Sequence, residues 1–277
     1  MNVAVVTIAH GRHSHLVVQA ESLLAGSRTP DQYVVVAMDD HDIGRTLEGL
    51  DLCTSVVEIA APREGLPLAR ARNVGVRRAL DDGADALVLL DVDCLAGPDL
   101  VAGYAACVGE EPWTIWSGPV TYLSPPPATG YDLRRLEGLD DPHPARPAPP
   151  PGVRMHGADP DLFWSLSFAL SATVWRRVGG FCEEYHGYGG EDTDFARLAT
   201  TQGVPFGWSG TPRAYHQFHP TSDPPVEHVE SILRNGALFH RRWGEWPMQG
   251  WLEELAALGL VVRTDGGWAS AATVTGA

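Results

Sequence analysis

The sequence predicts an α/β fold in which a mostly parallel central sheet is flanked by helices. Short β-branched runs alternate with helical patterns four times within about the first hundred residues, which is the βαβ signature of a parallel sheet. The apolar run at 86–94 has no breaker and is too short for a typical helix, so it indicates a buried central strand. Acidic residues close two of the predicted strands, at 39–40 and at 91–93.

In chain order, the first strands are predicted at 3–8, 32–38, 55–60 and 86–94, with helices at 15–25 and 68–80 between them. A Gly-Pro-Asp start signal at 97–99 predicts a helix over 95–108. The later pattern is looser, with strand-like pieces at 113–122, 204–208 and 213–216 and helices at 195–201, 227–243 and 247–258. The small, polar tail from residue 270 is expected to fray.

Proline interrupts the middle of the chain between residues 124 and 152. Such density excludes a helix interior or a central strand, so we predict a surface insertion over 124–160. Because it lies inside the chain, it is interpreted as part of one catalytic domain, 1–220, with a helical extension at 221–277 packed on that domain. A lid that orders over a bound ligand is a hypothesis for 124–160, since loops of that length are usually functional or disordered.

The composition argues against several classes of function. The 277 residues carry a net charge of −15, every basic residue is Arg, and no basic stripe for nucleic acid is visible. The acidic balance opposes adhesion to anionic lipid. No run of 18 apolar residues appears, and the first strand follows Met1 and Asn2 without a basic leader, so we expect a cytoplasmic protein without a membrane span. Four scattered cysteines fit a reduced compartment.

Two carboxylates, Asp91 and Asp93, stand at the carboxyl end of the predicted central strand. Open α/β sheets bind their ligands at that edge. Nearby carboxylates repel each other unless a cation or a sugar hydroxyl lies between them, and hard divalent cations prefer oxygen ligands. A lone Asp is often only a helix cap or a loop acid, so the interpretation depends on the neighbouring motifs.

The segment 187–194, Gly-Tyr-Gly-Gly-Glu-Asp-Thr-Asp, is the second informative motif. Its glycines allow a tight turn and close approach of the backbone to a ligand. One alternative is that Asp192 or Asp194 only caps the following helix and offsets its dipole. Capping accounts for one acid and one glycine but not for three of each, so a carboxylate placed as a general base is the functional interpretation.

His216 and His219 follow a short extended segment. A single His is more often structural than a metal ligand, but two close together, after two acidic motifs, favour metal binding. Whether His219 shares the metal role of His216 stays open at this point.

These motifs occur in a fixed order: an N-terminal βαβ half, then 70–75 (Arg-Ala-Arg-Asn-Val-Gly), Asp-Val-Asp at 91–93, Gly-Gly-Glu-Asp at 189–192 and Tyr-His-Gln at 215–217. As an ordered set they resemble the family 2-type glycosyltransferases of the GT-A fold. The resemblance is greatest to β-1,4-galactosyltransferase and to the galactosyl- and N-acetylgalactosaminyl-transferring domains of chondroitin polymerases. It covers about residues 3–220.

The resemblance implies where a nucleotide sugar would bind. The loop after the first strand would wall the base, the acid after the second strand would bind base or ribose, and the motif at 70–75 would approach the nucleotide. By position, the residues implied are Thr7, Ala9, His10, Gly11, Arg12, Asp39 or Asp40, Arg70, Asn73, Asp91, Val92 and Gly190. The loop sequence Thr-Ile-Ala-His-Gly-Arg departs from the pattern of many relatives, which puts its base contacts in doubt. For Arg70 and Arg72, an exposed helix face is an equal alternative.

The resemblance also implies the chemistry. Asp93 and His216 would bind Mn²⁺ or Mg²⁺, which neutralises a leaving diphosphate, and Asp91 would contact the ribose, the donor sugar or the metal. Glu191 would hold a sugar hydroxyl and Asp192 would deprotonate the acceptor. A single base without a second nucleophile predicts inversion. Trp164 and Tyr188 are candidates for stacking on a sugar face, while Trp243, Trp246 and Trp251 are expected to attach the two C-terminal helices to the main domain.

The predicted reaction is therefore transfer of a hexose, from a donor that is most simply UDP-linked, to an acceptor hydroxyl of a small glycoside, natural product, peptide or saccharide. One alternative is a nucleotidyltransferase, but the first loop has one Gly and no Lys, unlike the phosphate loops of that class. The other is a non-catalytic sugar-binding protein on the same fold, which the presence of Asp91, Asp93, Asp192 and His216 disfavours.

Overall fold

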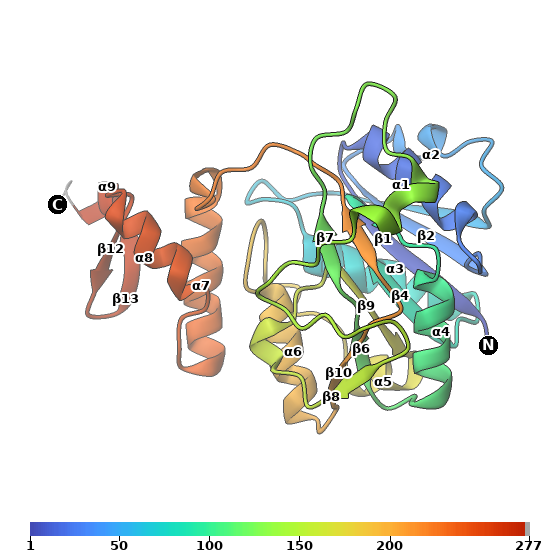
Figure 1. Cartoon of the computed structure of the whole chain (residues 1–277). Coiled ribbons are helices and arrows are strands. Elements are labelled where there is room, and N and C mark those ends of the chain that lie inside the picture. Colours follow the sequence, from blue (N-terminus) through green and yellow to red (C-terminus); the bar gives the residue numbers. More distant parts are fainter. Residues whose placement is uncertain (275–277) are drawn as a thin grey trace.

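The structure, a computed structural model, describes residues 1–274, and an eight-stranded sheet forms its centre (Figure 1). In spatial order its strands are β3 (Thr54–Ile59), β2 (Gln32–Met38), β1 (Val3–Ala9), β4 (Ala86–Leu90), β9 (Ser167–Ser171), β6 (Ile115–Ser117), β10 (Phe206–Ser209) and β8 (Arg154–His156). The first four are parallel, whereas β9 runs antiparallel to both β4 and β6. The predicted fold class is confirmed.

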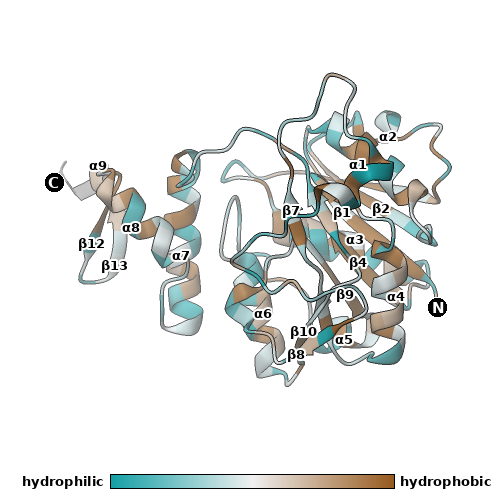
Figure 2. Ribbon diagram, in the orientation of Figure 1, coloured by the Kyte–Doolittle hydropathy of each residue, from teal (hydrophilic) through white to brown (hydrophobic). Residues whose placement is uncertain are grey.

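Helices cover both faces of this sheet: α1 (His13–Ala25), α2 (Ile43–Thr46), α3 (Leu68–Asp81), α4 (Leu100–Glu110), α5 (Ala172–Val178) and α6 (Glu191–Thr201). Alternate residues of β1 face opposite layers, as the period of a strand requires. Val3 and Val5 belong to a core with α1, α2 and α4, while Ala4 and Val6 belong to a core with α3, α5 and α6. Figure 2 shows the hydrophobic strands enclosed between these layers.

A second sheet of three short strands, β5 (Cys94–Ala96), β11 (Ala214–His216) and β7 (Val120–Tyr122), lies beside the carboxyl end of β4. The chain turns at 91–93, where the Cys94 amide donates to the Asp91 carbonyl (2.8 Å), and then enters β5. Three predicted boundaries are therefore wrong. The central strand ends at Leu90, the helix expected from residue 95 starts at Leu100, and the strand expected at 113–122 is two strands in different sheets.

The proline-rich insertion 124–160 lies on the surface with fixed contacts. It contains the 3₁₀ segment η1 (Leu133–Leu139) and the edge strand β8. Leu136 and Arg146 are buried, and Arg213 pairs with Asp140 at 2.6 Å. Its middle is thereby attached to the main domain beside β11.

The C-terminal segment forms a small unit with a core of its own. After a 3₁₀ turn, η3 (Val226–His228), it comprises α7 (Val229–Trp243), α8 (Gln249–Ala257), the hairpin β12 (Val261–Thr264) and β13 (Gly267–Ser270), and α9 (Ala271–Val274). Ile232, Leu252, Leu255 and Val261 make its core, with Trp246, Trp251 and Trp268 against it. The two helices were predicted and the hairpin was not. Of the tail expected to fray, residues 275–277 lie outside the described residues.

Within residues 1–274, no helix combines the length and apolarity that a membrane span requires.

Candidate active site

Asp93, His216 and His219 form a cluster that we call the metal cluster. Asp93 Oδ1 lies 3.5 Å from His216 Nε2, and Asp93 Oδ2 lies 3.4 Å from His219 Nε2. One ligand atom from each residue falls within 4.8 Å of the others, as ligands of a single ion must. The pairing of β11 with β5 creates this cluster, because it sets His216 directly opposite Cys94. His219 thus joins the two residues predicted from the sequence.

The protonation states in the metal cluster suit a cation. Burial alone would raise the pKa of Asp93, but the hydrogen bond from His219 and the charges of His216 and Arg12 bring that pKa below its ordinary value. Burial lowers the pKa of His216 in spite of the nearby Asp93 carboxylate. An ionised carboxylate and a neutral imidazole are the forms that bind metal ions.

Neighbouring side chains hold the metal cluster in place. The Tyr122 ring stacks on His216, with centroids 4.5 Å apart. The Gln217 amide N–H donates to the Asp93 carbonyl at 2.6 Å, and the Gln217 side chain donates to the His15 carbonyl at 3.0 Å. Neither Tyr122 nor Gln217 was predicted as a site residue, although Gln217 belongs to the Tyr-His-Gln motif.

The loop after β1 brings the guanidinium group of Arg12 close to the metal cluster. Arg12 has a left-handed backbone (φ 50°), and its Nη1 lies 3.7 Å from Asp93 Oδ2. Asp40 holds the loop by accepting from the Gly11 amide (2.7 Å) and from His13 Nε2 (2.8 Å). The Asp40 carboxylate therefore binds groups of the protein itself, and His13 has a structural partner. Arg12 is left facing the ligand edge, where the resemblance expects a diphosphate.

Two other residues implied in nucleotide binding lie under the loop. Thr7 is fully buried, with its hydroxyl 2.9 Å from both Gln19 Oε1 and the Leu90 carbonyl, and Ala9 is 1% exposed. Asp39 is exposed in a left-handed conformation (φ 46°) and accepts from the Ala61 amide at 3.0 Å. Side-chain contact with a nucleotide thus fits Asp39 and Arg12, while Thr7 supports the loop from below.

A second group, here called the buried acid cluster, joins the buried residues Arg72 and Glu191 to the half-buried Asp91 and Asp192. Arg72 Nη2 lies 3.1 Å from Asp91 Oδ1, and its Nη1 lies 3.2 Å from Glu191 Oε1. Asp91, expected to contact sugar or metal, faces Arg72, and it does not belong to the metal cluster within residues 1–274. Arg72 is buried while Arg70 is exposed, so the exposed-face alternative is wrong for Arg72. Helical spacing places Arg72 on the face of buried Ala69 and Val76, a signal that the sequence analysis did not use.

The carboxyls of the buried acid cluster hold protons more tightly than usual. Burial raises the pKa of Glu191 to about 7, with a contribution from the Asp192 charge and against the attraction of Arg72. Burial also raises the pKa of Asp91 to about 6 and raises that of Asp192, again opposed by Arg72. Carboxyls with raised pKa values are suited to accept and release protons near neutrality.

Neither Asp192 nor Asp194 is the N-cap of α6. Gly190 occupies that position in a left-handed conformation (φ 92°), without a side-chain cap. Asp194 is fully buried and accepts from Arg242 Nε (2.6 Å), Trp243 Nε1 (2.7 Å) and the Tyr185 hydroxyl (3.2 Å). Neither acid is therefore the N-cap, but both lie in the first turn of α6, where they offset the helix dipole, and Asp192 accepts from the Thr193 amide at 2.8 Å. Asp194 also joins α6 to α7.

Asn73 has a structural role in place of the predicted approach to the nucleotide. It is 6% exposed, donates to the Phe181 carbonyl (2.9 Å) and accepts from the Phe181 amide (2.8 Å). A Cβ at Gly180 would lie 2.7 Å from Asn73 Oδ1, so the turn at 179–180 can approach α3 only with glycine there. Asn73 thus secures the segment that leads to the acids of α6.

Arg146, from the proline-rich insertion, is buried without an ion pair. Its guanidinium carbon lies 5.1 Å from the centre of the Trp164 ring and 4.7 Å from that of Trp208. Within the described residues, its three guanidinium nitrogens have no hydrogen-bond partner. Burial lowers the pKa of Arg146 to about 10. Trp164 also contacts His143 (5.2 Å between ring centres), so this candidate for sugar stacking is part of an aromatic group that holds the insertion.

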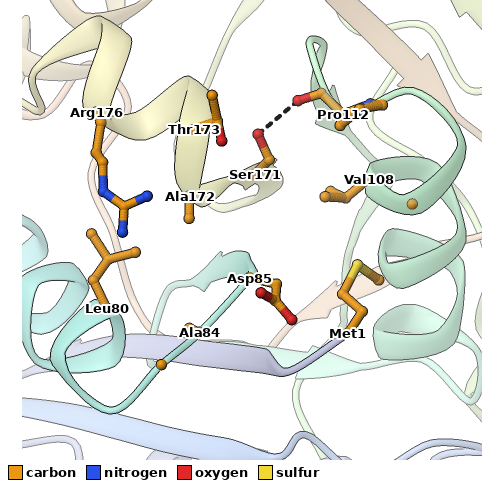
Figure 3. Close-up of a pocket in the computed structure, with 12 residues that line it drawn as sticks. Met1, Leu80, Ala84, Asp85, Val108, Pro112, Ser171, Ala172, Thr173 and Arg176 are labelled. Carbon is orange, nitrogen blue, oxygen red and sulfur yellow. Dashed lines mark hydrogen bonds between the residues drawn. The ribbon is translucent and has the colours of Figure 1, made fainter.

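One surface cavity lies away from these groups, at the opposite edge of the sheet. It measures about 530 Å³ and is lined by Met1, Leu80, Asp85, Val108 and Arg176, among others (Figure 3). Asp85 directly precedes β4, whereas Asp91 and Asp93 follow it. The cavity is therefore separate from the ligand edge.

Sequence comparisons point to glycosyl transfer. A family model described as the N-terminal domain of galactosyltransferase matches residues 158–220, which include Glu191, Asp192, His216 and His219. Two curated relatives are validoxylamine A glucosyltransferases, from Streptomyces hygroscopicus subsp. limoneus (29% identical over 216 residues) and subsp. jinggangensis strain 5008 (32% over 170). The alignments cover 66% and 51% of this chain but 44% and 37% of the relatives, so the chain spans less than half their length.

Solved structures share the fold. GalNAc-T7 with UDP, GalNAc and Mn²⁺ aligns with a TM-score of 0.56 and 14% identity over 93% of this chain and 57% of its own. Residues 1–349 of S. aureus TarS align with a TM-score of 0.56 and 13% identity over 86% of this chain and 65% of theirs. The fold is that of GT-A glycosyltransferases, and the matched segment and the curated relatives make the chain similar to glycosyltransferases. The predicted resemblance to GT-A glycosyltransferases is confirmed.

Proposed function

We propose that the chain transfers a hexose from a UDP-sugar to an acceptor hydroxyl, with inversion at the anomeric carbon and with a divalent metal. The observation that carries the proposal is the metal cluster, in which Asp93, His216 and His219 offer ligand atoms within 4.8 Å at the ligand edge of the sheet. Solved structures of the same fold contain UDP, one of them with Mn²⁺, and the curated relatives are named glucosyltransferases. These support the donor class and the hexosyl group.

The ligand set favours Mn²⁺ over Mg²⁺. Two imidazole nitrogens and one carboxylate oxygen suit a transition metal, whereas Mg²⁺ takes oxygen ligands almost throughout. A bound ion would supply Lewis-acid neutralisation of the leaving diphosphate. Arg12, 3.7 Å from Asp93, adds a second positive charge beside that position.

The buried acid cluster supplies the remaining chemistry. Asp192, with its raised pKa, accepts the proton of the acceptor hydroxyl as that oxygen attacks the anomeric carbon. Glu191 and Asp91, both held by Arg72, are proposed to bind hydroxyls of the donor sugar. Because one base acts and no second nucleophile is needed, the donor reacts by a single displacement, which inverts the anomeric centre.

Calorimetry and thermal unfolding with UDP, with and without Mn²⁺, test the proposal on the wild type and on Asp93→Ala. We expect UDP with Mn²⁺ to raise the unfolding temperature of the wild type only, by the linkage between binding and folding. Turnover is then measured as release of UDP from UDP-hexoses. Binding without turnover of any UDP-hexose would favour the sugar-binding alternative, and no response to UDP or any other nucleoside diphosphate would refute the proposal.

A further inference from the structure

The C-terminal helix α7 contacts the loop that carries the catalytic acids. We call residues 186–190 the glycine-rich loop; Glu191 and Asp192 follow it directly. Asn235 of α7 is fully buried, and its Nδ2 donates to three carbonyls of this loop: His186 (3.1 Å), Tyr188 (3.2 Å) and Gly189 (2.9 Å). A single side-chain amide therefore donates hydrogen bonds to three of the five carbonyls of the loop.

The contact is specific for the donor end of that amide. Oδ1 of Asn235 is buried and has no hydrogen-bond partner within residues 1–274. A buried acceptor without a partner is unfavourable, so the favourable part of the interaction comes from the N–H groups alone. Three convergent carbonyl dipoles repel one another, and the amide hydrogens offset that repulsion.

The glycines of the loop match the shape of the C-terminal unit. A Cβ built on Gly187 would lie 2.8 Å from Cβ of Ser231, and a Cβ built on Gly189 would lie 2.5 Å from Sδ of Met248. Both glycines also have positive φ, 75° and 92°. The close approach that glycine permits here is made by α7 and the segment before α8, in addition to any approach by a ligand.

Helix α7 holds the chain on both sides of the two acids. On the N-terminal side, Asn235 binds the glycine-rich loop, and Arg234 donates to the His186 carbonyl (2.6 Å) and to the Glu64 carbonyl (2.9 Å). On the C-terminal side, Arg242 and Trp243 bind Asp194, two residues beyond Asp192. The backbone from 186 to 194 is thereby fixed at both ends by one helix.

We propose that Asn235 is a positioning residue for the transfer reaction: its side-chain amide holds the glycine-rich loop so that Glu191 and Asp192 face the bound donor and acceptor. The inference rests on the proposed role of Asp192 as the base. It also makes the C-terminal unit a part of the active site. Because the loop residues at positive φ relax readily once released, loss of the amide is expected to displace the acids, and a misplacement of about 1 Å costs roughly 100-fold in rate.

The test uses Asn235→Asp, which keeps the shape of the side chain but replaces the N–H₂ group by oxygen. We expect kcat to fall roughly 10- to 100-fold, with the donor KM and the affinity for UDP with Mn²⁺ within about twofold of wild type, because donor binding depends on the metal cluster. Glu245→Ala is the matched control: Glu245 pairs with Arg197 of α6, so it also docks the C-terminal unit but does not contact the loop. Its kcat should stay at the wild-type value.

A pH profile separates hydrogen bonding from packing. The carboxyl introduced by Asn235→Asp can donate one O–H to the loop carbonyls once it is protonated, so the ratio of the kcat of this variant to that of the wild type should rise as the pH falls. A packing role would leave this ratio constant. A wild-type kcat in Asn235→Asp, or equal losses in Asn235→Asp and Glu245→Ala, would overturn the proposal.

Hydrogen exchange keeps the inference separate from the proposed function. In Asn235→Asp, amides at 186–192 should exchange at least about tenfold faster, while those of β4 should not change. If the wild type transfers no sugar from any nucleotide donor, the proposed function fails, and unchanged exchange at 186–192 would independently overturn the positioning role.

Discussion

The metal cluster and the buried acid cluster lie at the same edge of the sheet but are organised in opposite ways. In the metal cluster, imidazole and guanidinium groups surround Asp93 and lower its pKa. In the buried acid cluster, one guanidinium, that of Arg72, is shared by several carboxyls, and burial raises their pKa values. Two carboxylates two residues apart, Asp91 and Asp93, thereby receive different environments. The difference shows how one acidic site can keep one carboxylate ionised for a cation and another ready to exchange protons.

The largest expected effect separates the two clusters by function. Asp192→Asn should lower kcat by about 10³-fold, within the range for loss of a general base, and should leave the affinity for UDP with Mn²⁺ unchanged. Asp93→Ala is the contrasting variant and should lose that affinity. Calorimetry and steady-state kinetics measure both. An Asp192→Asn enzyme that retains more than about a tenth of the wild-type kcat would remove Asp192 from the role of base.

The next effect concerns the arginine that holds the buried acid cluster. Arg72→Met leaves Asp91 and Glu191 without their shared partner, so the free energy of unfolding should fall by about 3–5 kcal/mol. Urea unfolding at neutral pH measures the loss. Arg70→Met, on the exposed face of the same helix, is the control and should change the free energy by less than about 0.5 kcal/mol. Equal effects of the two substitutions would contradict the bridging role of Arg72.

The pH dependence of stability should show the raised pKa of Glu191. The folded protein holds this proton up to about pH 7, while the unfolded chain releases it near the ordinary value of 4.5. The stabilisation is therefore complete below about pH 4.5 and is lost as the pH rises through 7. Urea unfolding of metal-free protein between these limits measures the slope. Glu191→Gln should reduce it, and a free energy of unfolding that rises over this range would contradict the assignment.

The smallest expected effect compares two buried arginines. The Arg146 guanidinium packs on Trp164 and Trp208 and, unlike that of Arg72, has no carboxylate partner among residues 1–274. Removing an unpaired buried charge in favour of an apolar side chain of similar length costs little, so Arg146→Met should change the free energy of unfolding by no more than about 1 kcal/mol, and in the stabilising direction if the thioether packs well. A loss as large as that of Arg72→Met would show that the guanidinium has a partner after all.

Much of the site followed from local patterns. Short motifs contain the acids at 91–93 and 191–192 and His216, and the residues next to them in the sequence indicate their chemistry. The misassigned residues are those whose role depends on distant partners. Asn73 was expected at the nucleotide but binds Phe181, 108 positions away. For Arg72, helical spacing could have indicated a buried face, but its partner Glu191 lies 119 positions away.

The sequence by itself determined the alternating strands and helices of the first half and the chemical character of each motif, because hydrophobic period and turn residues act over a few positions. The tertiary structure alone decided which motifs meet. The antiparallel β9 between β4 and β6, the pairing of β11 with β5 and the docking of α7 on the glycine-rich loop all depend on side-chain packing between distant segments. No local pattern encodes that packing, and it is what places His219 beside Asp93 and Asn235 behind the loop that leads to Glu191 and Asp192.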